Sequence, residues 1–276
     1  MVSIEQYGEF ETTWCPGCGN FSIVASLKKA LTELELAPHE VMVSSGIGQA
    51  AKTPHYMNCH MFNGLHGRSL PVAQGMKMAN PEMTVICESG DGCSYGEGGN
   101  HFLAAIRRNL DITLLVHNNQ IYGLTKGQAS PTTMRGQVTK TQPDGAPSEP
   151  FNPVAVAVAM KAGFVARAFS GEPEHLVTTI KAAINHQGFS LVDIIQPCVS
   201  FNKVNTFAWY KERAYILEGH DTSDWCGAME KADEFVEKIP LGVIYQNDRP
   251  PFENHGQLAT QSYSKDDLKA VLQSFA

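Results

Sequence analysis

The sequence predicts an α/β fold with a doubly wound, mostly parallel sheet, and three observations support this. Two short apolar runs, residues 84–87 and 111–117, end at glycine or asparagine turns, as buried parallel strands do. Residues 97–109 between them carry apolar side chains at helical spacing and end in two arginines, which favour a helix C-terminus. Apolar runs and amphipathic stretches alternate along the rest of the chain. A right-handed crossover should therefore bring the ends of both strands to one edge of the sheet.

Composition indicates one large domain and excludes several classes of protein. The 276 residues are 43% hydrophobic, enough for one full core, so we expect a single domain over residues 1–276. A formal charge of −7 gives no basic footprint for nucleic acid. The apolar runs are too short for a membrane span and no secretory leader pattern opens the chain, so we expect a cytoplasmic protein. Seven cysteines, an odd number, favour metal binding, redox chemistry or burial over a disulfide framework.

The first segment joins two cysteines to a helix. Cys15 and Cys18 stand directly before a stretch in which Val24, Leu27 and Leu31 form one apolar stripe, which predicts a helix. The helix N-terminus should lower the pKa of the thiols and offer both sulfurs to one metal or to one disulfide exchange. The spacing alone leaves both uses open.

The next predicted strand, residues 41–45, leads into a loop of small residues, SGIGQAAK at 45–52, which can admit a ligand. Lys52 in this loop is either a surface lysine or a cation directed into a site. His66, in LHGR at 65–68, precedes a predicted helix at 69–79 and is either a helix cap or a site group. The sequence alone leaves both residues open.

The strand–helix–strand unit in the middle of the chain carries the clearest chemical signal. Gly90, Asp91 and Gly92 follow its first strand, and Asn118 and Asn119 follow its second. Asp91 and Asn119 should meet at the sheet edge, where oxygen ligands beside glycines suit a Mg²⁺ ion that also holds phosphate oxygens. For Gly-Asp-Gly taken alone, an ordinary turn remains the alternative.

The second half of the chain continues the alternation. Residues 135–150 are polar and rich in proline and glycine, which predicts a loop. The patterns that follow predict a helix at 153–162 begun by Asn152, a strand at 164–169, a helix at 173–187, a strand at 189–196 that delivers Cys198, helices at 210–217 and 223–239, a strand at 241–245 and a last helix capped by Ser264. We expect residues 247–261 to form an arm against a partner.

Two levels of resemblance follow from these motifs. Gly-Asp-Gly followed by Asn-Asn after the next strand is typical of thiamine diphosphate enzymes, and this stretch resembles their diphosphate-binding half. Along nearly its whole length the chain resembles the β chain of 2-oxoacid:ferredoxin oxidoreductases. The shared motifs are WCPGCGN at 14–20, SGIGQAAK at 45–52, LHGR at 65–68, GDG at 90–92, GGNHFLAAIRRN at 98–109, NNQIYGLTKGQASPTT at 118–133, QPC at 196–198 and WYKERAYILEGHD at 209–221. The run at 121–133 is most similar to the 2-oxoglutarate and broad-range 2-oxoacid branches.

The resemblance implies a thiamine diphosphate-binding fold and its cofactor residues. Asp91, Asn119 and the main-chain carbonyl of Ile121 would hold Mg²⁺. The implied cofactor-binding residues are Gly46, Ile47, Gly48, His66, Gly90, Asp91, Gly92, Asn119, Ile121, Gly123, Leu124 and Thr125.

The resemblance also implies a [4Fe-4S] cluster, with one departure from the family pattern. Cys15, Cys18 and Cys198 match three cluster ligands, and thiolates are the usual ligands of such clusters. The family has its fourth cysteine where this chain has Gln49, and a glutamine amide is a poor substitute for a thiolate. We expect Cys59, on the same connection, to complete the set, with a buried thiol as the alternative.

The implied reaction is the oxidative decarboxylation of a 2-oxoacid, with 2-oxoglutarate favoured. Coenzyme A would be acylated, and electrons would pass through the cluster to ferredoxin. His66 matches a histidine near the thiazolium ring, while Lys52 and Lys126 match polar positions near the substrate carboxylates. An α subunit with the pyrimidine-binding domain would complete an (αβ)2 assembly. Two alternatives remain: a thiamine diphosphate decarboxylase or synthase half without electron transfer, and a non-catalytic metal-binding partner subunit.

Overall fold

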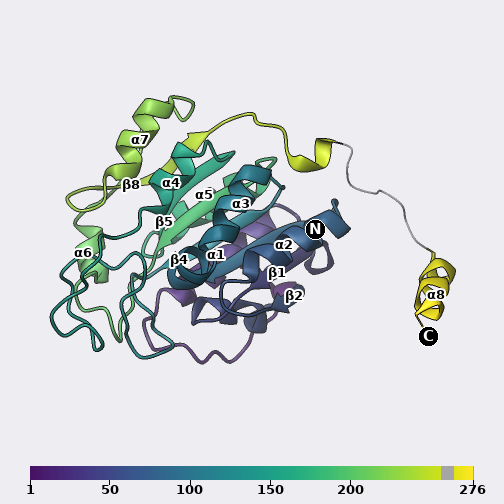
Figure 1. The fold of residues 1–276 in the computed structure, drawn as a ribbon, viewed down its shortest axis with the longest axis horizontal. Helices are drawn as coiled ribbons and strands as arrows, with labels where there is room; N and C mark the ends of the chain where they lie inside the picture. The colour runs from purple at the N-terminus through teal and green to yellow at the C-terminus, as the bar shows by residue number, and fades with distance from the viewer. Residues whose placement is uncertain (256–263, 276) are drawn as a thin grey trace.

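The apolar runs assemble into one eight-stranded sheet in the order β2-β1-β3-β4-β6-β5-β8-β7 (Figure 1). The structure is a computed structural model that describes residues 1–255 and 264–275. The strands are β1 Val41–Ser45, β2 His60–Asn63, β3 Thr84–Gly90, β4 Thr113–Asn118, β5 Phe164–Phe169, β6 Ser190–Ile195, β7 Ala214–Ile216 and β8 Ile239–Gln246. Each described strand pair is parallel except β5 with β8. The predicted mostly parallel α/β fold is confirmed.

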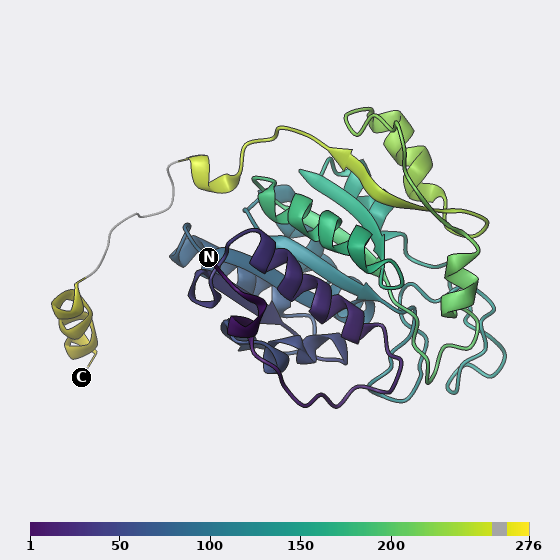
Figure 2. The ribbon, with the colours of Figure 1, turned by 180° about the vertical axis from the view of Figure 1, so that it is seen from behind.

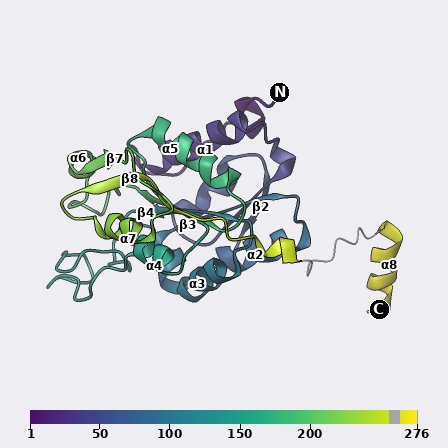
Figure 3. The same ribbon diagram turned by 90° about the horizontal axis from the view of Figure 1, so that it is seen from above.

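Helices cover both faces of this sheet, as a doubly wound fold requires (Figures 2 and 3). One face carries α1 Asn20–Glu33 and α5 Pro173–Asn185, and the other carries α2 Ser69–Ala79, α3 Gly99–Arg108 and α4 Pro153–Ala159. The remaining helices are α6 Phe207–Lys211, α7 Trp225–Asp233 and α8 Lys265–Ser274, and the short turns are η1 Ile4–Tyr7, η2 Pro38–Glu40, η3 Ala50–Tyr56, the π-helical η4 Gly92–Glu97 and η5 Phe252–His255.

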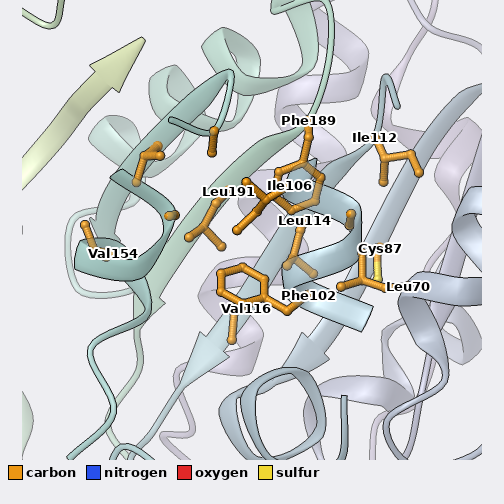
Figure 4. Close-up of a cluster of buried hydrophobic side chains, with 14 of the residues drawn as sticks. Leu70, Cys87, Phe102, Ile106, Ile112, Leu114, Val116, Val154, Phe189 and Leu191 are labelled. Carbon is orange, nitrogen blue, oxygen red and sulfur yellow. The ribbon is translucent and has the colours of Figure 1, made fainter. Parts of the chain in front are cut away.

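The core lies on both faces of the central strands. Phe102 and Ile106 of α3 pack in one apolar cluster with Leu114 and Val116 of β4, and all four are fully buried (Figure 4). Leu115, between the last two, belongs to the cluster on the α1 and α5 face. Because both faces of β4 are covered, its sequence is a continuous apolar run rather than an alternating one.

The strand order places a crevice between β1 and β3. From β1 the chain moves outward to β2, whereas from β3 it moves the opposite way to β4, so the loops after β1 and β3 diverge. Open α/β sheets bind ligands at the carboxyl ends of the strands at such a switch point. The loops at residues 46–52 and 90–92 therefore border the expected binding crevice.

Three secondary-structure predictions need correction. In place of the predicted helix at 210–217, the chain forms α6 and then β7, whose backbone pairs with β8. The helix predicted at 223–239 is shorter, because α7 ends at Asp233 and Ile239 already belongs to β8. These pairings join segments distant in sequence, which local periodicity does not reveal. Strand β2 was not predicted, because it is a four-residue edge strand whose side chains are all exposed.

The predictions for the long loop and for the C-terminal region agree in part with the structure. Residues 135–150 form a loop, as predicted, and Ser264 caps α8 by accepting a hydrogen bond from the Asp267 N–H at 3.1 Å. In the predicted partner-contacting arm, the carbonyls of Arg249 and Pro250 accept hydrogen bonds from Asn109 Nδ2 of the chain's own body, while residues 256–261 lie outside the described residues. None of the helices in the described ranges is both long and apolar enough to cross a membrane.

Candidate functional site

A cavity of about 220 Å³ lies at the carboxyl ends of β1, β3 and β4, at the switch point of the sheet. The loops after these three strands, together with the turn before α2, supply its walls. The lining residues are Ile47, Gly48, Gln49, Ala50, His66, Gly90, Asp91, Gly92, Cys93, Asn119, Ile121, Tyr122, Gly123, Leu124 and Thr125. The structure thus brings together every predicted cofactor-binding residue except Gly46.

Asp91 is the buried carboxylate of this cavity, with 2% of its surface exposed. Its Oδ2 accepts hydrogen bonds from the hydroxyls of Ser130 and Thr132, the latter at 2.7 Å. Burial raises the pKa of Asp91 to about 6, although both hydrogen bonds favour the ionised form. A cation in the cavity would stabilise that charge, which fits the predicted metal site. Ser130 and Thr132 were not predicted as site residues, because hydroxyls in a polar loop carry no distinctive pattern.

The two asparagines at the end of β4, one inside the strand and one directly after it, have different roles. Asn118 is buried and turns back into the protein, where its Nδ2 donates to Asp193 at 3.2 Å. Asn119 lines the cavity, and its Oδ1 accepts the N–H of Ile121 at 3.0 Å. Gln120 between them has a φ of +58° and is anchored inward, since its Oε1 accepts from Tyr210 at 3.0 Å. The left-handed turn therefore directs Asn119 and Ile121 toward the cavity together.

Glycines allow the cavity loops to approach one another. A Cβ at Gly92 would lie 2.1 Å from the Tyr122 ring, and one at Gly46 would lie 2.4 Å from Cys93 Sγ. At Gly48, with a φ of +132°, a Cβ would meet nothing within 4 Å. Gly46 thus allows its loop to pack closely against Cys93 in the cavity wall, whereas Gly48 leaves open space beside the cavity.

The donor set fits a diphosphate held through Mg²⁺. One carboxylate, two side-chain amides and main-chain groups line the cavity, and its described lining contains no lysine or arginine. A bound diphosphate would therefore need a metal ion to neutralise its charge, and Mg²⁺ prefers oxygen ligands of this kind. Because only one of these ligands is a carboxylate, the site is not a cluster of acidic or histidine side chains.

His66 enters the cavity wall with a partner that the sequence did not indicate. Glu97 Oε2 lies 2.8 Å from His66 Nε2 and accepts a hydrogen bond from the Tyr122 hydroxyl at 3.1 Å. His66 Nδ1 is buried and has no hydrogen-bond partner in the described chain. A single glutamate therefore orients both rings of the cavity wall.

The two predicted substrate lysines are not part of the cavity lining. Lys52 Nζ donates to Thr13 Oγ1 at 2.9 Å, which directs it toward the N-terminal segment. Lys126 is exposed and has a φ of +79°. The geometry of this chain alone gives neither lysine a contact with the cofactor cavity.

A second, smaller pocket of about 30 Å³ gathers three cysteines. Cys15, Cys18 and Cys198 line it together with Gln49 and Gln196. The Gln196 amide donates to Cys18 Sγ at 3.3 Å. Within residues 1–255 and 264–275, no three His, Cys, Asp or Glu side chains are arranged closely enough to form a ready metal site. The cysteines face one pocket without converging on one point.

The pKa of Cys18 differs from the sequence prediction. Burial raises the pKa of this thiol, and the neighbouring Cys198 and Cys15 add to the effect, although the N–H of Asn20 at the helix start lowers it. The predicted lowering at the helix N-terminus is therefore wrong for Cys18, because burial outweighs the helix end.

Gln49 stands between the two cavities. Gln49, Asn119 and Gly123 line both of them. The carbonyl of Gln49 accepts from Trp14 Nε1 at 2.8 Å, while its side-chain Oε1 is buried without a partner in the described chain. The residue that replaces the family cysteine thus occupies the wall of the cysteine pocket.

Cys59 lies elsewhere. It packs against the apolar cluster on the α1 and α5 face, which includes Tyr7 and Met57, and it is not in the lining of the cysteine pocket. Burial, with a smaller effect from the charge of Glu88, raises the pKa of Cys59 to about 12. The structure does not bring Cys59 into the pocket of the other three cysteines and places it, partly buried, against the core.

Comparison with known proteins gives two family matches. Residues 40–194 match the family "Thiamine pyrophosphate enzyme, C-terminal TPP binding domain". Residues 198–260 match the family that describes the C-terminal part of the pyruvate ferredoxin oxidoreductase β chain. The first match spans both the cavity loops and the sheet from β1 to β6.

Similar proteins cover nearly the same length. The β subunit of 2-oxoacid:ferredoxin oxidoreductase 1 from Aeropyrum pernix is 44% identical over 95% of this chain and 87% of its own. The 2-oxoglutarate synthase subunit KorB from Archaeoglobus fulgidus is 38% identical over 85% of this chain and 91% of its own. A solved 2-oxoglutarate:ferredoxin oxidoreductase from Magnetococcus marinus, with 2-oxoglutarate, coenzyme A and succinyl-CoA bound, matches 98% of this chain and 96% of that chain, with a TM-score of 0.89 and 35% identity.

Proposed function

The chain belongs to the family of 2-oxoacid:ferredoxin oxidoreductase β subunits, and from this premise we propose that it binds thiamine diphosphate with Mg²⁺ in the cavity at the switch point. The observation that carries the proposal is the convergence of Asp91, Asn119 and Ile121 in one glycine-bordered cavity. With an α subunit it would catalyse the oxidative decarboxylation of a 2-oxoacid. We also propose a cytoplasmic location, which agrees with seven cysteines that form no disulfide with one another.

The residues of this chain bind and orient, while the cofactor supplies the chemistry. Asp91 and Asn119 side-chain oxygens and the Ile121 carbonyl would hold Mg²⁺, and the glycines at 90 and 92 would let the diphosphate approach the backbone. Thiamine diphosphate, when bound, supplies the nucleophilic carbon that attacks the keto group and allows CO₂ to leave. We propose that His66, which lines this cavity, lies near the thiazolium ring of the bound cofactor.

Cys15, Cys18 and Cys198 are the proposed thiolate ligands of an iron–sulfur cluster that passes electrons to ferredoxin. Support comes from their shared pocket and from its common wall with the cofactor cavity at Gln49. The position of Cys59 outside this pocket argues against Cys59 as a fourth ligand. We propose that these three cysteines would hold a [4Fe-4S] cluster, to which Gln49 would supply no fourth thiolate.

The proposed substrate is 2-oxoglutarate, because KorB relatives and the Magnetococcus marinus enzyme bear that name. Coenzyme A would accept the acyl group. Lys52 and Lys126 remain proposed contacts of the substrate carboxylates, completed by an α subunit that carries the pyrimidine-binding domain in an (αβ)2 assembly. We propose that residues 247–261 contribute to contacts with that partner and that residues 1–276 act as one cofactor-binding unit.

The test is anaerobic co-purification with the α subunit, followed by measurement of iron, acid-labile sulfide and bound thiamine diphosphate per β chain. We expect about four irons in the wild type and in Cys59→Ala, and much less iron in Cys198→Ala. The two alanine variants are a matched pair, because each removes one partly buried thiol. Iron that falls equally in both variants would restore Cys59 to the ligand set.

A non-redox thiamine diphosphate enzyme is the second proposal, and Gln49 favours it. A glutamine in the cysteine pocket provides no thiolate, so the cluster site is incomplete by the usual ligand count. Bound thiamine diphosphate without iron, in a complex that decarboxylates a 2-oxoacid without ferredoxin, would establish this alternative. Absence of both cofactors from the intact complex would contradict the two proposals together.

A further inference from the structure

We propose that Glu97 is a positioning residue for His66: its carboxylate accepts the Nε2–H hydrogen and thereby holds the imidazole in one tautomer and one orientation beside the group bound in the cavity. The inference deepens the proposed function and rests on it for the identity of that group. The proposal rests on two observations. His66 Nε2 lies 2.8 Å from Glu97 Oε2, and His66 Nδ1 is buried and has no hydrogen-bond partner in the described chain.

The local fold holds the two residues together. Glu97 ends the π-helical turn η4, which begins directly after Asp91, and such turns occur often at functional sites. The turn that carries His66 packs against the backbone of Glu97, since a Cβ at Gly67 would lie 2.6 Å from the Glu97 carbonyl carbon. Gly67 also has a φ of +75°, which favours glycine. A close backbone approach therefore sets the distance between the imidazole and the carboxylate.

The same carboxylate oxygen binds a second ring of the cavity wall. Tyr122 donates its hydroxyl hydrogen to Glu97 Oε2 at 3.1 Å, and the centroids of the His66 and Tyr122 rings lie 6.0 Å apart. Two donors on one oxygen fix the direction of the Glu97 side chain better than one would. Glu97 thus links the loop before α2 with the loop after β4.

This arrangement selects one tautomer of His66. In a neutral imidazole one ring nitrogen carries the hydrogen and the other carries a lone pair, and the partner of the first decides which. A carboxylate accepts hydrogen bonds and cannot donate when ionised, so it holds the hydrogen on Nε2. Nδ1 then has a lone pair and no partner from the described chain, although a buried polar atom normally has one. This enclosed Nδ1 leaves Nε2 as the ring nitrogen within reach of Glu97.

A purely structural ion pair explains these contacts less well. The His66 and Glu97 side chains are 33% and 49% exposed, and pairs this exposed contribute little to folding. A Glu97 variant should therefore fold normally. Its effect should fall on the orientation of His66 rather than on the stability of the chain.

The experiment compares Glu97→Gln, Glu97→Asp and the matched control Glu149→Gln in the complex with the α subunit. Glu149 forms an exposed pair with Arg135 and lies outside the cavity lining, so its variant should keep wild-type activity. For Glu97→Gln we expect kcat to fall roughly 10- to 100-fold, less than the loss of a complete general acid–base group. KM for the 2-oxoacid should stay within about threefold, because Glu97 does not bind substrate directly, and Glu97→Asp should regain most of the lost kcat.

A measurement on the free chain reads the tautomer directly. With nitrogen-labelled histidine, the two ring-nitrogen resonances of His66, assigned by their loss in His66→Asn, should show the hydrogen on Nε2 in the wild type and a tautomer mixture in Glu97→Gln. Unchanged resonances in Glu97→Gln, or a kcat equal to that of Glu149→Gln, would overturn the proposal. If the wild-type complex binds no thiamine diphosphate, the proposed function fails, and the resonances still decide the role of Glu97.

Discussion

The cofactor cavity and the cysteine pocket share a wall, yet the chain builds them in different ways. The cofactor cavity is formed by loops that follow the neighbouring strands β1, β3 and β4, all parallel. The cysteine pocket joins residues 14–20 near the start of the chain to residues 196–201 after β6 and to Gln49. Sheet topology creates most of the first site, whereas the second depends on how separate loops close over one another.

The two sites also differ in how firmly their ligands are held. Asp91 is buried and fixed by hydroxyl donors from the loop after β4. Among the three cysteines, Cys18 receives one amide hydrogen bond, while Cys15 is exposed. The comparison indicates a cavity organised in advance of its ligand and a pocket that a metal cluster would complete.

The largest effect is expected from Asp91→Asn, which tests whether the cofactor cavity depends on its buried carboxylate. The amide keeps the shape and removes the charge, so the affinity of the complex for thiamine diphosphate with Mg²⁺ should fall by at least about 100-fold. Asp144→Asn, on the exposed loop, is the matched control and should bind normally. Titration calorimetry of both variants decides the point, and equal affinities would remove Asp91 from the metal site.

A smaller effect is expected from Gln49→Cys, which tests whether position 49, in the wall shared by the two sites, faces the proposed cluster. The new thiol would stand in the lining of the cysteine pocket, at the position where the resemblance implies a fourth cysteine ligand. After brief exposure to air we expect the wild type to retain about three irons per chain and the variant about four, because a fourth thiolate holds the exposed iron. Gln49→Asn, which adds no sulfur, should behave as the wild type does. Equal iron retention in Gln49→Cys and Gln49→Asn would show that this position does not face the cluster.

The same contrast explains what the sequence could predict. The central strands are buried on both faces, so their apolar runs are visible, and parallel topology then brings Asp91 and Asn119 to one edge. Most of the cofactor cavity can therefore be predicted from the apolar strand pattern and from the right-handed crossover between parallel strands. Glu97 was missed because the π-helical turn that orients it has no periodic signal.

The cysteine pocket shows where such reasoning stops. Cys59 and Gln49 lie ten residues apart on one connection, and their spacing does not reveal which of them faces Cys198. The answer depends on β2, an exposed edge strand that begins at His60 and draws Cys59 toward the α1 face. Strand β7 was missed for a related reason, since its partner β8 is more than twenty residues away.

The smallest effect on function is expected at Cys59, where the measurement tests whether this thiol belongs to the core rather than to either cavity. Its pKa is raised to about 12 from an ordinary value of 9.0, so the native state favours the neutral thiol. The thiolate is the form that alkylating reagents attack, and three pKa units mean that about 1,000 times less of it is present at pH 8. Iodoacetamide should therefore modify the exposed Cys15 and Cys226 in the native free chain and leave Cys59 unmodified, as peptide mass spectrometry would show.

The raised pKa of Cys59 also fixes how its contribution to stability depends on pH, and denaturation provides the control. Because the folded pKa is raised, the stabilisation from the neutral thiol is complete below about pH 9, the value in the unfolded chain, and is lost as pH rises toward 12. Denaturant at pH 8 should make Cys59 as reactive as Cys226, since unfolding removes the burial that protects it. Native Cys59 that reacts as fast as Cys226 would show that the core does not enclose this thiol, and Cys59 would return as a candidate for the cysteine pocket.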